Sequence, residues 1–336
     1  MVGFPDQGGP MRRRQFITLI GGVVACPSVI SAQPQSTPLI GFLSSLASSD
    51  LPLISPAFSD GLKAAGFIEG RSVLIEYRWA EGDYQRLPAL AAELTRLNVS
   101  VIAAISGTPA ALAAKAATTT IPIVIAIGGD PSAAGLVANL SRPDGNITGA
   151  SFYTSPLVTK RLDLARELAP QGHLIALLLN PNNPPSVAEG VAVQQAAAAL
   201  GQPLKILHAS TKGEIDDAFA ALAQQQAGAL IVSSDPFFFA ERVKLVVLMA
   251  RHALPTIFAD REQAEAGGLI SYGASRTDAY RQAGNYVGRI LKGEKPSEMP
   301  VVLPTKFQLL INVKTAKSLS IDIPATVLAR ADEVIE

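Results

Sequence analysis

Residues 99–109 read Val-Ser-Val-Ile-Ala-Ala-Ile-Ser-Gly-Thr-Pro and carry the clearest structural signal in the chain. A short, continuous apolar run of this kind is typical of a strand that is buried on both faces of a parallel sheet. Thr108-Pro109 then has the form of a helix start, with a capping residue before a proline at the first helical position. The stretch therefore predicts a strand near 99–105 that leads into a helix near 109–118.

The same alternation of apolar runs and alanine- and leucine-rich stretches extends in both directions and predicts an α/β protein with parallel sheets. In the first half we expect strands near 39–44, 72–78, 99–105 and 122–127, with helices near 53–66, 86–97 and 109–118. In the second half we expect strands near 173–179, 204–208, 228–233 and 255–258, with helices near 186–200, 214–226 and 237–252.

The two halves correspond to one another. Ser106-Gly107-Thr108-Pro109 has its counterpart 127 positions later in Ser233-Ser234-Asp235-Pro236, and Thr120–Val124 has its counterpart 133 positions later in Ala253–Ile257. Convergent spacing in any α/β protein is the alternative explanation. Several matches in the same order favour a true repeat. A repeat of this length indicates two similar lobes and not a solenoid.

We therefore expect two Rossmann-like lobes with parallel sheets, joined by a multi-strand hinge. The predicted boundaries are 38–150 for the N-terminal α/β lobe, 151–270 for the C-terminal α/β lobe, and 271–336 for a return segment and helix that complete the lobes and hinge. Within this region 267–273 reads as a strand or crossing segment, a helix follows near 278–292, and 301–304 and 307–311 are extended.

Residues 1–32 have the three-part layout of an export signal. A basic start at Arg12-Arg13-Arg14 precedes an apolar stretch over 16–25 and a small-residue end at Ser31-Ala32. The arginines followed by Gln15-Phe16 resemble a twin-arginine signal. We expect cleavage near Ala32 and a periplasmic protein; a lipid anchor through Cys26 is the less favoured alternative, because Pro27 follows the cysteine directly.

Composition excludes several function classes. The 336 residues include 28 basic and 28 acidic side chains, so there is no electrostatic footprint for nucleic acid. One cysteine excludes internal disulfides and cysteine zinc sites. Phosphate-binding lysine loops, dinucleotide glycine triplets and paired-histidine zinc motifs do not occur in the sequence. We expect no cofactor, no metal site and no catalytic residue.

Ligands of parallel α/β sheets bind outside the carboxyl ends of the strands, and these ends are rich in hydroxyl, amide and glycine residues. The candidate ligand-binding residues at these ends are Ser44, Ser45, Gly107, Thr108, Asp130, Asn180, Asn182 and Asp235. Helix capping is the alternative role for Thr108 and Asp235. The two roles are compatible, since a capped helix still directs free N–H groups into the cleft and holds a ligand carboxylate there without a dedicated arginine.

Aromatic residues gather near the same ends of the strands. The candidates are Tyr153, Phe237, Phe258 and Tyr272. Core packing is the alternative for each phenylalanine, whereas the two tyrosines stand where the chain should cross between the lobes. A cleft that combines helix N-termini with aromatic walls suits an amino acid or an aromatic carboxylate.

Several motifs together resemble one family. They are Arg12–Ile17, Tyr77-Arg78-Trp79-Ala80-Glu81-Gly82, Gly107-Thr108-Pro109-Ala110, Gly128-Gly129-Asp130-Pro131, Arg142–Gly149, Asn180-Pro181-Asn182-Asn183-Pro184, Ala264–Leu269 and Ser271-Tyr272-Gly273. In this order they resemble the ABC-transporter substrate-binding proteins that are often labelled as tryptophan/tyrosine transport components. The resemblance covers essentially the whole chain after residue 32.

The resemblance implies the type I periplasmic binding protein fold, a small-molecule solute, a membrane permease as partner, and a monomer. The solute would be a small carboxylate, by default an amino acid, with the aromatic amino acids included. Two alternatives stay open from the residues alone: an exported two-domain α/β enzyme, which would use Asp130, Asp235 or Glu262 as acid or base, and a ligand-sensing domain.

Overall fold

The structure is a computed structural model that describes residues 37–153, 157–169 and 172–336, together with residues 1 and 3. Thr37–Glu336 form one compact unit. The predicted export signal and Cys26 fall outside the described residues, apart from residues 1 and 3. None of the helices in the part of the chain that is described is long and apolar enough to cross a membrane.

A five-stranded parallel sheet, in the order β2-β1-β3-β4-β5, forms the centre of the N-terminal lobe, called lobe 1; the second sheet forms the centre of lobe 2. Its strands are β1 (Leu39–Ser44), β2 (Leu74–Trp79), β3 (Val101–Ile105), β4 (Ile123–Ile127) and β5 (Ile147–Ser151). Every residue of β3 and β4 is buried, as expected for strands that are covered on both faces. The first four strands were predicted from the sequence; β5 was not.

Helices cover both faces of this sheet. They are α1 (Leu51–Ala64), α2 (Leu87–Arg96), α3 (Thr108–Ala117) and, from much later in the chain, α10 (Arg276–Leu291). One buried cluster lies under α1 and α10, and a second lies under α2 and α3. Short 3₁₀ turns precede α1 and α2 at Ser48–Asp50 and Tyr84–Arg86.

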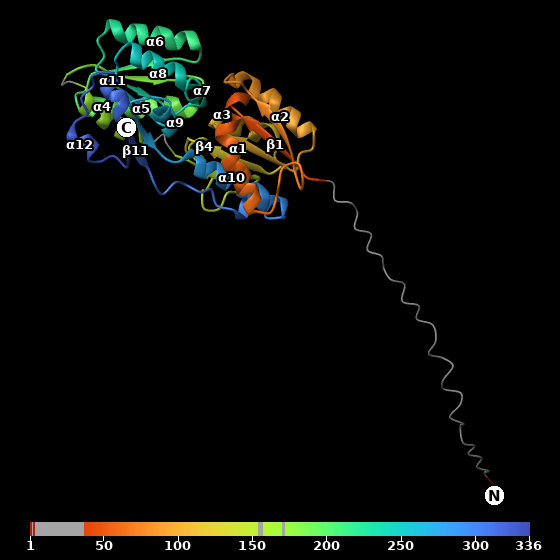
Figure 1. Ribbon diagram of the computed structural model, residues 1–336. Coiled ribbons are helices and arrows are strands. Elements are labelled where there is room, and N and C mark those ends of the chain that lie inside the picture. The colour runs from red at the N-terminus through yellow and green to blue at the C-terminus, as the bar shows by residue number, and fades with distance from the viewer. Residues whose placement is uncertain (2, 4–36, 154–156, 170–171) are drawn as a thin grey trace. The chain divides into compact units, whose positions relative to one another are not determined.

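Figure 1 shows α10 beside α1 in lobe 1, although more than 200 residues separate them in the sequence. The two helices approach very closely at two glycines. A Cβ atom on Gly61 would lie 1.9 Å from the carbonyl oxygen of Arg281, and one on Gly284 would lie 2.0 Å from that of Phe58. Any side chain at either position would push the helices apart, so the crossing depends on glycine.

Lobe 2 contains a seven-stranded sheet in the order β12-β11-β10-β9-β8-β6-β7. Its strands are β6 (Ile175–Leu179), β7 (Leu204–His208), β8 (Ala229–Val232), β9 (Thr256–Phe258), β10 (Ile270–Gly273), β11 (Gln308–Asn312) and β12 (Glu333–Ile335). All neighbours are parallel except β10 and β11. The order β7-β6-β8-β9-β10 repeats β2-β1-β3-β4-β5 of lobe 1, which confirms the expected similarity of the two lobes.

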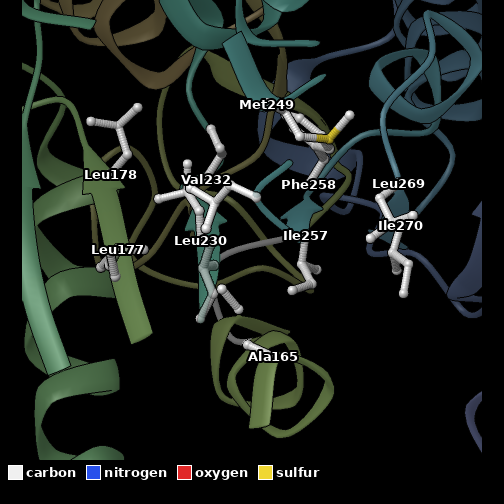
Figure 2. Packing of buried hydrophobic residues seen from close by; sticks show 14 of the residues in the cluster. Ala165, Leu177, Leu178, Leu230, Val232, Met249, Ile257, Phe258, Leu269 and Ile270 are labelled. Atoms are coloured by element: carbon white, nitrogen blue, oxygen red, sulfur yellow. The ribbon is translucent and has the colours of Figure 1, made fainter. Parts of the chain in front are cut away.

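The helices of lobe 2 surround an aliphatic core. They are α4 (Val158–Leu168), α5 (Pro184–Ala199), α6 (Lys212–Gln224), α7 (Pro236–Ala240), α8 (Arg242–Arg251), α9 (Arg261–Glu265), α11 (Val313–Ser318) and α12 (Ala325–Leu328). Figure 2 shows this core, in which Leu177, Leu230 and Ile257 of three neighbouring strands pack together above Ala165 of α4.

One predicted helix, 237–252, is wrong as a continuous element. The chain breaks at Glu241 into α7 and α8. The break allows Phe237, Phe238 and Phe239 all to be buried, which a single surface helix could not do. Phe237 and Phe238 belong to the core of lobe 2, whereas Phe239 joins the cluster under α1 and α10 of lobe 1.

The chain passes between the two sheets at three places: between β5 and α4, between β10 and α10, and between Val302 and β11. Val302 also adds an isolated parallel bridge to Ala150 at the end of β5, with Ser151 donating its N–H to the Val302 carbonyl at 2.8 Å. Two of the three connections are therefore hydrogen-bonded neighbours at the edge of lobe 1.

Candidate ligand-binding cleft

The strand ends of the two lobes converge on a small central cavity of about 10 Å³. Its walls include Gly107 and Thr108 after β3, Gly129 after β4, Asn183 after β6, Ser234 after β8, and Arg276 at the start of α10. A volume of this size holds about one water molecule. Any larger solute therefore enters only when the lobes move apart.

Glycine is required where the lobes touch beside this cavity. Gly107 has a φ of +136°, and a Cβ atom there would lie 2.6 Å from Cγ of Pro236 in lobe 2. A Cβ atom on Gly129 would lie 2.7 Å from Cγ of Pro185. The backbone of lobe 1 thus packs directly on the prolines that begin α7 and α5.

Asp235 is the hydrogen-bonding centre of the cleft. Its Oδ1 accepts from the backbone N–H of Phe237 at 2.8 Å, from the amide of Asn180 at 3.1 Å and from the hydroxyl of Tyr84 at 3.0 Å. Its Oδ2 accepts from the amide of Asn183 at 2.7 Å. Asp235 is 2% exposed, and burial raises the pKa of its carboxyl, although these hydrogen bonds act in the opposite direction.

Tyr84 brings lobe 1 into this network and was missed by the sequence analysis. It lies in the 3₁₀ turn before α2, donates to Asp235 and accepts from the Phe237 N–H at 3.1 Å. Burial and the Asp235 carboxylate raise the pKa of the Tyr84 hydroxyl well above its ordinary value, so it stays protonated and remains a donor. Asp235 therefore caps α7 and also forms a hydrogen bond between the two lobes.

Arg276 is the second residue that the sequence analysis missed. Only 3% of it is exposed, and its guanidinium lies over the rings of Phe239 (4.1 Å) and Phe152 (4.7 Å). Its Nη1 is 3.4 Å from Oδ2 of Asp260, but neither Nε nor Nη1 donates a hydrogen bond to any group of the described chain. Two guanidinium donors beside the central cavity are thus left for another acceptor.

A sequence signal for Arg276 does exist. It is the first residue of α10, directly after the capping residue Ser275. A cation at a helix N-terminus opposes the helix dipole, so an arginine there is unfavourable unless another interaction compensates for it. The buried ring faces and Asp260 supply that compensation.

Behind Arg276 lies a second cavity of about 40 Å³, which Glu262 also lines. Burial, and then the negative charge of Asp260, raise the pKa of Glu262. Its Oε2 accepts no hydrogen bond within the part of the chain described here. Arg276 therefore has acidic neighbours on one side and the central cavity on the other.

A larger outer cavity of about 780 Å³ lies at the mouth of the cleft, lined by residues of both lobes. The Arg242 guanidinium of lobe 2 donates to the Asp50 carboxylate of lobe 1 across it at 3.0 Å. Lys212 forms a further ion pair with Glu241 at 3.1 Å. The outer cavity is wide and polar, whereas the central cavity is narrow.

The structure brings some of the predicted site residues together. Gly107 and Thr108 line the central cavity, Ser45 lies beside Gly107, and Asn180, Asn182 and Phe237 line the outer cavity. Ser44 is buried, and its hydroxyl accepts from the N–H of Leu46 at 3.1 Å.

Other predicted residues lie elsewhere. The Asp130 carboxylate accepts hydrogen bonds from the Tyr153 hydroxyl at 3.2 Å and from the Ser132 N–H at 2.7 Å. Neither Asp130 nor Tyr153 lines the central or the outer cavity. Phe258 is fully buried in the core of lobe 2. Tyr272 lines a separate cavity of about 350 Å³ together with Phe307. Among the described residues, no group of three or more His, Cys, Asp or Glu side chains is placed to hold a metal ion.

Comparison with known proteins places this cleft in context. The chain is 26% identical over 262 residues to a tyrosine-binding protein of Clostridioides difficile. The matched residues are 78% of this chain and 75% of that protein. The solved structure of a conserved domain protein from Vibrio cholerae superposes with a TM-score of 0.80 at 29% identity, covering 89% of this chain and 99% of the other.

Two further solved structures are described as bound to a ligand or free of one. An ABC domain from Streptococcus pneumonia in complex with L-Trp has a TM-score of 0.77 at 26% identity, over 88% of this chain and 100% of the other. The ligand-free, open structure of a substrate-binding protein from Clostridium difficile has a TM-score of 0.61 at 26% identity, over 89% and 99% of the two chains.

More distant structures share the fold alone, such as a myo-inositol binding protein from Caulobacter at 12% identity and a TM-score of 0.58. The fold is that of the type I periplasmic binding proteins. The family described as ABC transporter substrate binding protein matches residues 44–335, which is nearly all of the compact unit. With its two similar lobes and the polar cleft between them, this chain belongs to the ABC transporter substrate-binding protein family.

Proposed function

We propose that this chain is the exported, periplasmic solute receptor of an ABC importer and that it holds a small carboxylate between its lobes. By default the solute is an amino acid, and the tyrosine and L-Trp named for two relatives make an aromatic one the first to test. The observation that carries the proposal is Arg276, whose Nε and Nη1 make no hydrogen bond within the described chain and which lines the central cavity.

The helices around Arg276 support an anionic ligand. α3 and α5 begin beside the central cavity, at Thr108 and Pro184, and are 10 and 16 residues long. The N-terminus of a helix carries a partial positive charge, which favours an anion. α3 also offers the N–H of Thr108, whereas Pro184 and Pro185 have none, so α5 acts mainly through its dipole. An arginine adds charged donors, which form strong hydrogen bonds to a carboxylate. Together these groups form a receptor for one carboxylate.

Closure on the solute requires contacts from both lobes. Gly107 and Thr108 come from lobe 1, and Asn183 and Ser234 come from lobe 2. A solute that touches both sets only when the lobes are closed favours the closed state by its differential affinity. The permease of the importer then receives the closed, loaded receptor, which acts as a monomer.

We propose no catalytic role for the cleft. The enzyme alternative needs a free acid or base, and Asp130, Asp235 and Glu262 were its candidates. Asp235 accepts hydrogen bonds on both of its oxygens, Asp130 caps a turn, and Glu262 lines the cavity behind Arg276. These roles favour a binding protein over an enzyme.

Thermal unfolding of the chain from residue 33 tests the proposal against amino acids, aromatic acids, sugars and short peptides. A ligand at a hundred times its dissociation constant stabilises the native state by about 2.7 kcal/mol. Each kcal/mol raises the midpoint by about 2–4 °C for a chain of this size. We expect a saturable shift from a carboxylate, without turnover. Shifts from sugars alone would refute the carboxylate assignment, and product formation would favour the enzyme.

A further inference from the structure

The wall of the central cavity is cationic on one side and neutral elsewhere. Arg276 contributes a guanidinium, and Gly107, Thr108, Asn183 and Ser234 contribute backbone, hydroxyl and amide groups. The described residues that line the central cavity include no Asp or Glu. Asp235 itself is not part of the wall, although its neighbours Ser234 and Pro236 are.

The carboxylates near the cavity either accept hydrogen bonds already or lie off its wall. Both oxygens of Asp235 are occupied by donors from Tyr84, Asn180, Asn183 and the Phe237 backbone. Asp130 accepts from the N–H groups of Ser132 and Ala133 at 2.7 and 3.1 Å and from the Tyr153 hydroxyl. Asp260 does not line the central cavity; its Oδ2 lies 3.4 Å from Nη1 of Arg276, and its Oδ1 accepts no hydrogen bond from the described chain. A ligand ammonium in the central cavity would therefore meet no unoccupied carboxylate on its wall.

One neutral acceptor is available instead. Asn183 is 2% exposed and lines the central cavity, and its Oδ1 accepts no hydrogen bond from the described chain. The orientation of this amide is fixed, because its Nδ2 donates to Oδ2 of Asp235 at 2.7 Å. Only the oxygen of Asn183 is left for a ligand.

A neutral amide oxygen distinguishes between two kinds of donor. A hydroxyl group satisfies it without bringing a charge into the cavity. An ammonium also brings a positive charge, and a buried charge that lacks an opposite partner is costly. Arg276 increases that cost, because it places a like charge nearby.

We propose that the solute of the central cavity is a carboxylate with a hydroxyl group, rather than an ammonium, on its second carbon. Arg276 and the N-termini of α3 and α5 hold the carboxylate, and Oδ1 of Asn183 accepts the hydroxyl proton. This inference rests on the carboxylate receptor of the proposed function and replaces its default solute, an amino acid, by a 2-hydroxy acid.

Calorimetric titration of the chain from residue 33 with matched compounds provides the test. One set is L-tryptophan, indole-3-lactate and indole-3-propionate; the other is L-leucine, 2-hydroxyisocaproate and 4-methylpentanoate. In each set the side chain is constant and only the second carbon changes. We expect at least one hydroxy acid to bind ten times more tightly than its amino acid and more tightly than the unsubstituted acid.

The other outcomes have separate meanings. An amino acid that binds as tightly as its hydroxy acid overturns the inference and leaves the proposed receptor standing. Failure of all six compounds to bind overturns the inference and the carboxylate assignment together.

A substitution in the wall gives a second, independent test. Thr108→Asp adds the missing carboxylate at the first residue of α3, where an acid suits the helix dipole. It should shift the ratio of hydroxy-acid to amino-acid affinity at least tenfold toward the amino acid. Thr119→Asp, on an exposed residue just after the same helix, adds the same charge away from the cavity and should leave the ratio unchanged. Equal ratios in both variants, each shown by its melting temperature to be folded, would overturn the inference.

Discussion

Asp235 and Arg276 are both buried charged side chains at the cleft, and their surroundings differ sharply. Donors from both lobes occupy the two oxygens of Asp235, whereas Nε and Nη1 of Arg276 donate to no group of the described chain. A buried charge with full hydrogen bonding stabilises a particular arrangement of the protein. A buried charge with unused donors is suited to a partner from outside. We therefore propose a structural role for Asp235 and a ligand-binding role for Arg276.

Substitution of Arg276 should give the largest effect on binding. Arg276→Gln removes the charge and the guanidinium donors, and loss of one partner from a buried, hydrogen-bonded charge pair costs about 2–5 kcal/mol. We expect carboxylate affinity to fall by about a hundredfold or more in calorimetric titration. Arg276→Lys retains the charge without the planar fork and should recover only part of the loss. Wild-type affinity in Arg276→Gln would remove Arg276 from the site.

Substitution of Asp235 should mainly reduce stability. Asp235→Ala leaves the buried amides of Asn180 and Asn183 and the Tyr84 hydroxyl without their acceptor, and each buried unsatisfied group costs about 1–3 kcal/mol. We expect the free energy of unfolding in urea to fall by several kcal/mol, with a smaller loss of affinity than in Arg276→Gln. The reverse ranking of the two affinities would contradict the division of roles.

Substitution of Gly107 tests whether the lobes must approach through bare backbone. Gly107→Ala places a Cβ atom 2.6 Å from Pro236 at a φ of +136°. The closed state should lose about 1–3 kcal/mol, and ligand affinity should fall about tenfold. Gly135→Ala is the matched control, since Gly135 also has a positive φ (+67°) but has no atom within 4 Å of an added Cβ. If both variants lost the same ligand affinity, the loss would come from backbone strain at a positive φ and not from the contact between the lobes.

Glu262 should give the smallest effect, and one that depends on pH. Burial raises its folded-state pKa above the ordinary 4.5, so the ionised form costs stability at neutral pH. As the pH falls through the raised pKa toward 4.5, the wild type takes up this proton and gains stability that Glu262→Gln cannot gain. In urea unfolding, we expect the free energy of unfolding of the variant, relative to that of the wild type, to be highest near pH 7 and to decrease toward pH 4.5. A stability difference that does not change with pH would exclude this role for Glu262.

The repeating strands were predictable because buried parallel strands have a strong local signature. The 39–44 and 122–127 runs consist mostly of large apolar residues, and they match β1 and β4 within a residue. β5 was missed because Ile147-Thr148-Gly149-Ala150-Ser151 contains one large apolar residue and a glycine. The break in the helix 237–252 could not be seen locally, because it depends on Phe239 packing against the other lobe.

The polar strand ends were predictable as a group, but their individual roles were not. Thr108, Asn180 and Asp235 do lie at the cleft, since the ends of parallel strands meet there. Tyr84 and Arg276 come from a 3₁₀ turn and from a helix that returns across the hinge, so their approach to Asp235 and the central cavity depends on tertiary structure alone.

The return of α10 to lobe 1 also constrains how the chain can fold. Residues 37–151 contain the complete first sheet, but α10, which covers one face of it together with α1, is not complete until residue 291. Until then α1 lacks its closely packed neighbour at Gly61, and the buried face around Phe58 and Tyr280 is incomplete. Lobe 1 is therefore discontinuous along the chain, and its folding requires contacts of high sequence separation, which slow folding. A nascent chain that is cut before residue 276 should not form a stable lobe 1, whereas the segment from α4 to β10 has all of its parallel strands in one continuous stretch.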